Sequence, residues 1–124
     1  MKVLVAFEKE YRVYMAAIAD AIRMFRSNVE VALTNTDQLE AEVERFAPQL
    51  VICSSPIPSN PVAPKIVGFI ELSPDPDQHS RFQVGEHSWE STNPSLSEIL
   101  PALDETTRLY RTSHEQGPIE TDET

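Results

Sequence analysis

Polar side chains that could bind a ligand follow three apolar runs of the chain. Glu8 and Glu10 come after the first run, Ser54 and Ser55 after the second, and Ser73 after the third. Carboxylates at such positions could hold a cation, and serines with neighbouring backbone N–H groups could hold an anion. Charged turn residues and strand-end serines also serve simply as solvated groups and turn formers. If the three runs are parallel strands, their carboxyl ends meet and these residues line one crevice.

Nucleophiles and metal ligands are sparse in this sequence. Cys53 is the single cysteine and lies within an apolar run, which favours a packed core residue over a nucleophile. The three histidines, His79, His87 and His114, share no metal-ligand spacing, and no glycine-rich loop suits a phosphate. We therefore expect no metal site, no cofactor and no catalytic nucleophile–base pair.

The composition predicts one globular domain followed by an acidic tail. A length of 124 residues fits a single domain, and an apolar fraction of 40% is enough for its core. The net charge of -10 repels phosphate backbones and anionic lipids, so we expect no binding to nucleic acid or membranes. The single cysteine and the short apolar runs predict a soluble, cytoplasmic protein. We expect the domain over residues 1–111 and a disordered, acidic tail over 112–124.

The first half of the chain alternates between strand and helix patterns. Continuous apolar runs over 2–7 and 50–53 predict buried strands of a parallel sheet, and the alternation over 29–33 predicts an edge strand. Two segments between these strands have apolar residues at helical spacing. The first apolar face comprises Tyr14, Ala17, Ile18, Ala21, Ile22 and Phe25, and the second comprises Leu39, Val43 and Phe46.

The pattern becomes less regular after residue 53. Four prolines within 54–64 exclude an ordinary helix there, and residues 65–72 predict a fourth strand. Residues 81–91 fit either a short helix or a strand that runs through Trp89. Both alternatives remain open at this point.

A final helix is predicted from Leu96 to Tyr110, and Pro101 should kink it or mark a second start. Because crossovers between parallel strands are right-handed, the order of elements predicts a three-layer α/β fold. We expect the flavodoxin-like arrangement, with a parallel sheet of order 2-1-3-4-5.

Residues 1 to about 111 resemble a response-regulator receiver domain, most clearly over Ala47–Pro58. In receivers this stretch reads Pro-Asp, four apolar residues and then the phosphoacceptor Asp. Here it reads Pro48-Gln49, the apolar residues 50–53 and then Ser54, so Ser54 stands at the position of the phosphoacceptor. At the first strand, Phe7 and Glu8 stand where receivers carry an acidic pair that holds magnesium. The chain also departs from the receiver pattern: too few residues separate Ser54 from the fourth strand for the third helix, which we expect to be missing, and we expect the fourth helix to be reduced.

The segment Gly85–Pro94 is similar to the receiver segment Gly-Ala-x-x-aromatic that is followed by Lys-Pro. Trp89 stands at the aromatic position, and Thr92 or Asn93 stands at the position of the lysine.

The resemblance implies a phosphorylation site without its chemistry. Aspartyl phosphorylation needs a carboxylate nucleophile, Mg²⁺ held by carboxylates, and a cation that stabilises the transferred group. Phe7, Ser54 and Thr92 supply none of these, and Glu8 alone is a poor magnesium ligand set. We expect a pseudo-receiver that is not phosphorylated on aspartate, has no catalytic activity, and regulates signalling through protein–protein contacts.

The missing helices predict that part of the sheet is left without cover. Apolar parallel strands need cover on both faces, so we expect a homodimer or a protein partner to bind through residues 56–90. The candidate interface residues are Ile57, Phe69, Phe82 and Trp89.

The alternative hypothesis is a small-molecule-binding domain or a small enzyme. It would use the crevice at the carboxyl ends of the strands, with Glu8, Glu10, Ser54 and Ser73 as polar contacts. Fold class does not decide between the two hypotheses. A thermal-shift screen against nucleotides and metabolites separates them, because a large stabilisation by one ligand favours the binding domain.

Overall fold

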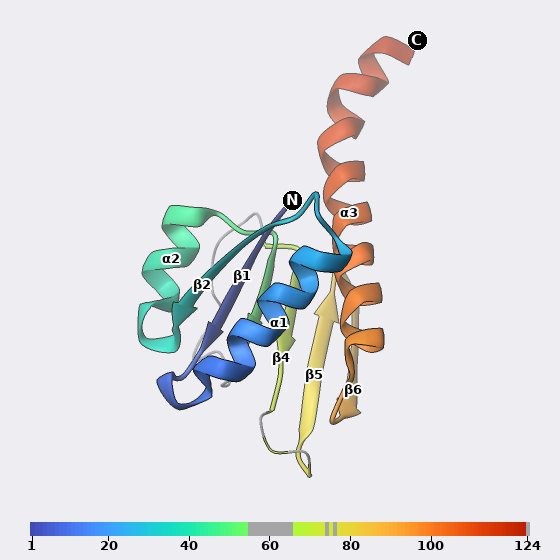
Figure 1. Cartoon of the computed structure of the whole chain (residues 1–124). Helices are drawn as coiled ribbons and strands as arrows, with labels where there is room; N and C mark the ends of the chain where they lie inside the picture. The colour runs from blue at the N-terminus through green and yellow to red at the C-terminus, as the bar shows by residue number, and fades with distance from the viewer. Residues whose placement is uncertain (55–65, 74, 76, 124) are drawn as a thin grey trace.

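The computed structural model describes residues 1–54, 66–73, 75 and 77–123, with side chains described as far as Thr112. These residues form six β-strands and three α-helices, and the helices lie on both faces of one mixed sheet (Figure 1). The strand order across the sheet is β2-β1-β3-β4-β5-β6. The chain is therefore an α/β protein with its sheet between two helical layers.

The strands are β1 (Lys2–Phe7), β2 (Glu30–Asn35), β3 (Leu50–Cys53), β4 (Gly68–Glu71), β5 (His79–Val84) and β6 (His87–Thr92). The α-helices are α1 (Arg12–Phe25), α2 (Leu39–Phe46) and α3 (Leu96–Glu123). Single 3₁₀ turns, Lys9–Tyr11 and Thr36–Gln38, lead into α1 and α2.

The first four strands pair in parallel, with β1 between β2 and β3. Every residue from Val3 to Phe7 and every residue of β3 is buried. Parallel strands become buried in this way because the crossover helices cover both faces of the sheet. The predictions of buried strands at 2–7 and 50–53, and of an edge strand near 29–33, are confirmed.

Two cores lie on opposite faces of this sheet. The larger core, under α1 and α3, includes Val3, Val5, Phe7, Ile18, Ile22, Ile52, Ile70, Phe82 and Leu103. The smaller core, under α2, contains Leu4, Ala6, Leu39, Val43, Phe46, Val51 and Cys53. Alternate residues of β1 belong to different cores because successive side chains of a strand point to opposite faces. Cys53, only 1% exposed, is a packed core residue in this structure.

The second half of the sheet is antiparallel, so the prediction of a parallel sheet of order 2-1-3-4-5 is wrong there. β5 runs antiparallel to β4, and β6 runs antiparallel to β5. Only residues 72–78 separate β4 from β5, whereas a parallel crossover needs a dozen or more residues. The segment 81–91 therefore contains two strands, joined by a tight turn in which Gly85 has φ +60°.

A single helix, α3, follows the hairpin and passes through Pro101 without a second start. It packs on the sheet with Ile99, Ala102 and Leu103, and its later turns extend beyond the sheet (Figure 1). Side chains after Thr112 lie outside the described part of the chain. The disordered, acidic tail over 112–124 and the domain boundary at 111 stay predictions.

Candidate functional site

The carboxyl ends of β1 and β3 meet at one edge of the sheet and bring Glu8 beside Ser54. The Glu8 backbone N–H donates a hydrogen bond to the Ser54 hydroxyl oxygen at 3.2 Å. The Ser54 N–H donates in turn to the carbonyl of Ala6 at 3.2 Å. Ser54 is only 8% exposed, so this hydroxyl is a largely buried link between two strand ends.

The neighbouring position, Phe7, lies in the larger core and contributes no oxygen ligand. Its ring is fully buried and meets Tyr14 edge-on, with 5.5 Å between ring centroids. Partial burial raises the pKa of the Tyr14 hydroxyl. Within the described ranges, no three His, Cys, Asp or Glu side chains gather closely enough to hold a metal ion.

Glu10 and Ser73 are not drawn into the Glu8–Ser54 contact. Glu10 is exposed in the turn before α1. Ser73 follows β4, where its N–H donates to the Ser80 hydroxyl at 2.9 Å and its own hydroxyl bonds to the backbone of Asp75. These hydrogen bonds fix the loop into β5. Ser55 lies outside the described residues.

Thr92 ends the sheet's outermost strand, far from Ser54. Thr92 pairs with His79 of the neighbouring strand β5, and three strand spacings separate β6 from β3. At about 4.8 Å per spacing, the two positions are roughly 14 Å apart. The structure therefore brings together Glu8 and Ser54, with Phe7 alongside, but not Thr92.

The candidate interface residues lie in three different environments. Phe69 is half-buried and packs against the smaller core. Phe82 is a core residue with 1% exposure, so it offers no surface in the single chain. Trp89 is 41% exposed and stacks on Phe82, with 5.1 Å between centroids and 8° between ring planes. Ile57 lies outside the described residues.

The outer face of the hairpin is polar, which corrects the expectation of an apolar sheet face there. In β5 the exposed residues are His79, Arg81 and Gln83, and they alternate with buried ones. Glu90 of β6 lies 3.0 Å from His79 and 3.7 Å from Arg81. An antiparallel hairpin can leave one face in water, so this part of the sheet needs no cover.

The sequence interpretation missed an exposed apolar surface on α1. Val13 is 84% exposed, Met24 75%, Phe25 53% and Tyr14 39%. Tyr14, Ala17 and Phe25 were expected on the buried face, and all three are exposed. The residues that α1 buries are Met15, Ile18, Ala19 and Ile22. The available signal was composition: α1 has only three charged residues in 14, too few for a polar outer side.

No described helix has the length and apolar character needed to cross a membrane. Comparison with family models, curated proteins and solved structures found no match for this chain.

Proposed function

We propose that this chain is a non-catalytic, receiver-like regulatory module that acts in the cytoplasm by binding protein. The observation that carries the proposal is the strand tip, where the buried Ser54 hydroxyl accepts a hydrogen bond from the Glu8 N–H. A phosphoacceptor there would have to be a carboxylate beside paired oxygen ligands for magnesium. With Phe7 in the core, this tip offers no such pair.

The parallel order β2-β1-β3-β4 supports the flavodoxin-like assignment for the first part of the sheet. The antiparallel hairpin takes the place of the last crossover unit of that arrangement. We therefore propose a receiver-like fold in which an antiparallel hairpin, β5–β6, replaces the last parallel strand and its helix.

The surface proposed for protein binding is the outer face of α1. Val13 and Met24 are three helical turns apart and both project into water, with the exposed Ala17 between them. Clustered apolar side chains on a surface mark interaction sites, because water contact with them is unfavourable. Burial of each such large side chain is worth about 1.5–3 kcal/mol.

A second copy of the chain is the partner that this face suits. Asp20 and Arg23 lie among the apolar residues, 3.2 Å apart, and are both exposed. In a two-fold dimer with antiparallel α1 helices whose axis passes near Ala17, Val13 of one copy would face Met24 of the other. The small Ala17 would let the two helices approach closely.

The dimer is tested by measuring the molar mass in solution at micromolar concentrations. We expect a dimer for the unmodified chain and a monomer for Val13→Glu combined with Met24→Glu, because each glutamate would be buried without a partner. Gln38→Glu combined with Gln83→Glu adds the same two negative charges at exposed positions outside α1 and should leave the dimer intact. A monomeric unmodified chain would refute the dimer. A dimer that only Trp89→Ala dissociates would move the interface to β6.

The absence of aspartate phosphorylation is tested separately. The protein is incubated with a small-molecule phosphodonor and Mg²⁺, and its intact mass is measured under conditions that preserve acyl phosphates. We expect no added phosphoryl group. A phosphoryl adduct that forms on the unmodified chain would overturn the non-catalytic assignment.

A further inference from the structure

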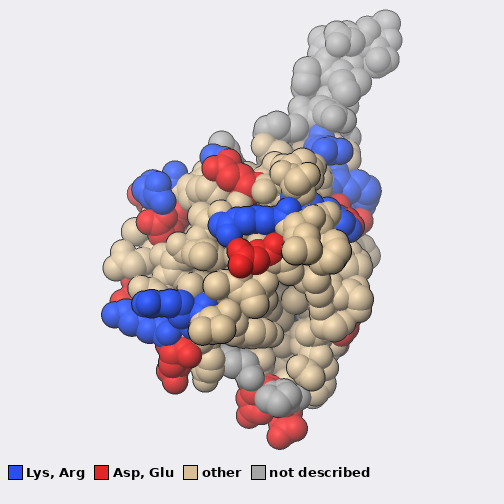
Figure 2. Space-filling model, in the orientation of Figure 1, with Lys and Arg blue, Asp and Glu red and all other residues tan. Residues whose placement is uncertain are grey.

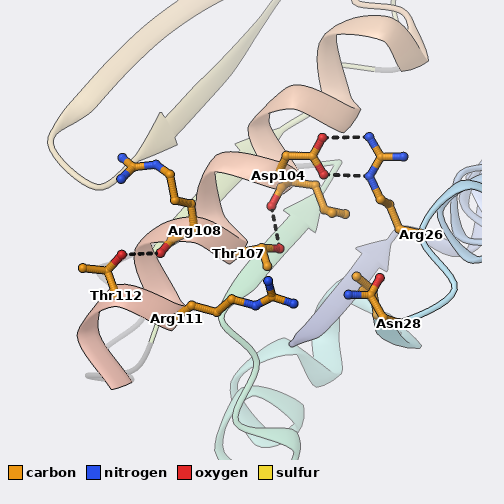
Figure 3. A pocket seen from close by; sticks show the side chains of 9 residues that line it. Arg26, Asn28, Asp104, Thr107, Arg108, Arg111 and Thr112 are labelled. Carbon is orange, nitrogen blue, oxygen red and sulfur yellow. Dashed lines mark hydrogen bonds and ion pairs between the residues drawn. The ribbon is translucent and has the colours of Figure 1, made fainter. Parts of the chain in front are cut away.

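A cavity of about 500 Å³ lies at the end of the parallel sheet opposite the Glu8–Ser54 contact. It is bounded by the end of α1, the chain entering β2 and the middle of α3 (Figure 3). Its lining residues are Arg26, Asn28, Val29, Leu103, Asp104, Thr107, Arg108, Arg111 and Thr112. The cavity is open to solvent, because most of its polar lining residues are exposed: Asn28, Asp104, Arg108, Arg111 and Thr112.

The lining is cationic although the whole chain carries a charge of -10. Three arginines and Asp104 line the cavity, and Glu105 pairs with Arg108, so the arginines exceed the neighbouring carboxylates by one positive charge. Figure 2 shows Lys and Arg side chains on this face, with Asp and Glu side chains between them. A local reversal of the overall charge is the electrostatic feature expected of a site for a small anion.

The three arginines differ in how many of their N–H groups already donate hydrogen bonds to carboxylates. Arg26 donates two hydrogen bonds of 2.7 Å to the Asp104 carboxylate, and Arg108 donates to Glu105 at 3.0 Å. Arg111 forms no ion pair or hydrogen bond in the part of the chain whose side chains are described. Its guanidinium reaches from α3 past Thr107 toward Asn28 (Figure 3).

The hydroxyl groups of the lining are already used as donors. Thr107 donates to the Leu103 carbonyl at 3.0 Å, and Thr112 donates to the Arg108 carbonyl at 2.8 Å. Among the lining side chains, the Arg111 guanidinium and the Asn28 amide are thus the groups whose N–H donors are all uncommitted within the described part of the chain.

We propose that this cavity binds a small oxyanion carrying at least two negative charges, held directly by Arg111 and Asn28. A guanidinium fork matches the paired oxygens of phosphate and carboxylate groups. The Arg26–Asp104 pair forms one wall and fixes the end of α1 against α3. Apart from its polar groups, the lining offers only the aliphatic side chains Val29 and Leu103, which favours a compact anion over a nucleotide that needs an aromatic platform. The acidic remainder of the surface repels long polyanions, so a small anion is selected.

The site is tested by NMR titration of the ¹⁵N-labelled chain with pyrophosphate at low ionic strength, where screening is weak. We expect amide shifts confined to the segments that contain Asn28, Thr107 and Arg111. Arg111→Gln should weaken binding about tenfold or more. Arg12→Gln removes the same charge from the far end of α1 and should leave the affinity within about twofold.

A variant that is expected to bind pyrophosphate more tightly shows that the weaker binding of Arg111→Gln does not simply reflect a loss of folding. Asp104→Asn releases the Arg26 guanidinium and should tighten pyrophosphate binding by up to about fivefold. A parallel titration with citrate identifies the source of the anion: binding of pyrophosphate alone indicates a phosphate compound, and binding of both indicates oxyanions in general. No binding of either probe, shifts scattered over the surface, or equal losses in Arg111→Gln and Arg12→Gln would overturn the proposal.

Discussion

In β1 and β3 buried residues follow one another without interruption, whereas in β5 buried and exposed residues alternate. The first pattern belongs to strands covered by helices on two sides, and the second to a hairpin that α3 covers on one side. The backbone hydrogen bonds of the sheet are thus formed by parallel pairing in one half and by antiparallel pairing in the other. Connections that contain α1 and α2 join the parallel strands β1, β2 and β3, whereas short connections give the antiparallel hairpin.

In this chain, the length of a connection decides the direction of the next strand more directly than the composition of that strand does. The segment 72–78 is too short for a crossover, so β5 must return alongside β4. Once β5 is antiparallel, one of its faces can stay in water and carry charge. The half of the sheet that lacks crossover helices is therefore also the half that does not need them.

The sharpest test of this contrast is made within β5. Phe82→Ala removes a ring that is 1% exposed and should lower the free energy of unfolding by about 3–5 kcal/mol. Gln83→Ala changes the next residue, on the polar face, and should alter it by less than about 0.5 kcal/mol. Urea denaturation measures both values. Comparable losses for the two variants would contradict a one-sided hairpin.

The parallel half should respond to substitutions on both faces. Leu4→Ala opens the smaller core and Ile52→Ala the larger one, and each should cost about 2–5 kcal/mol of unfolding free energy. Leu33→Ala, on the edge strand where the side chain is 41% exposed, is the matched control and should cost less than about 1 kcal/mol. If Leu4 tolerated the change as Leu33 does, α2 would not seal its face of the sheet.

The two halves meet at Gly68, at the start of β4. A Cβ atom added there would lie 2.7 Å from the Thr106 hydroxyl oxygen and 3.0 Å from the Leu50 Cδ1 atom. Gly68→Ala should therefore cost about 1–3 kcal/mol, because α3 would have to move off the sheet. Thr106→Ala removes the closest contact, so the double variant should lose less stability than the sum of the single losses. Additive losses in this double-mutant cycle would exclude the contact as the cause.

The smallest expected effect concerns the Arg26–Asp104 pair. The hydrogen bonds from Arg26 hold the pKa of Asp104 below its usual value. The pair therefore stabilises the fold at any pH above about 3.9, the ordinary aspartate pKa, and this stabilisation disappears as the pH falls through the lowered pKa. Because both side chains are partly exposed, the contribution is small.

Asp104→Asn should remove that contribution at pH 7. The difference in unfolding free energy between Asp104→Asn and the unmodified chain should then shrink as the solution is acidified, which urea denaturation at a series of pH values measures. Asp20→Asn breaks a more exposed ion pair with Arg23 and should cost less. A difference that grows toward low pH would have the wrong sign.

The parallel half of the fold could be predicted from sequence because continuous apolar runs and helical spacing are local signals. The same signals placed Ser54 at the end of β3, next to the end of β1. The hairpin could not be predicted by assigning each segment a class, because 81–91 contains two strands separated by Gly85. The length of the preceding connection would have indicated it.

The two surfaces to which we assign binding were less accessible to sequence analysis, each for its own reason. In α1, apolar residues occur on most sides of the helix, so their spacing does not show which side faces the sheet. Tyr14 and Phe25 were therefore expected to be buried. The arginine-lined cavity joins residues that are distant in sequence, such as Asn28 and Arg111, and no local pattern connects them.

The position of β6 at the rim of the sheet has one further consequence. Its outward row of backbone N–H and C=O groups has no neighbouring strand in the described part of the chain. The strand is six residues long and contains neither proline nor lysine, and its carboxylate, Glu90, lies against His79 and Arg81 of β5, so little blunts this rim. In concentrated solution we expect growth by strand addition at this rim, and a lysine in place of Ser88 should suppress it.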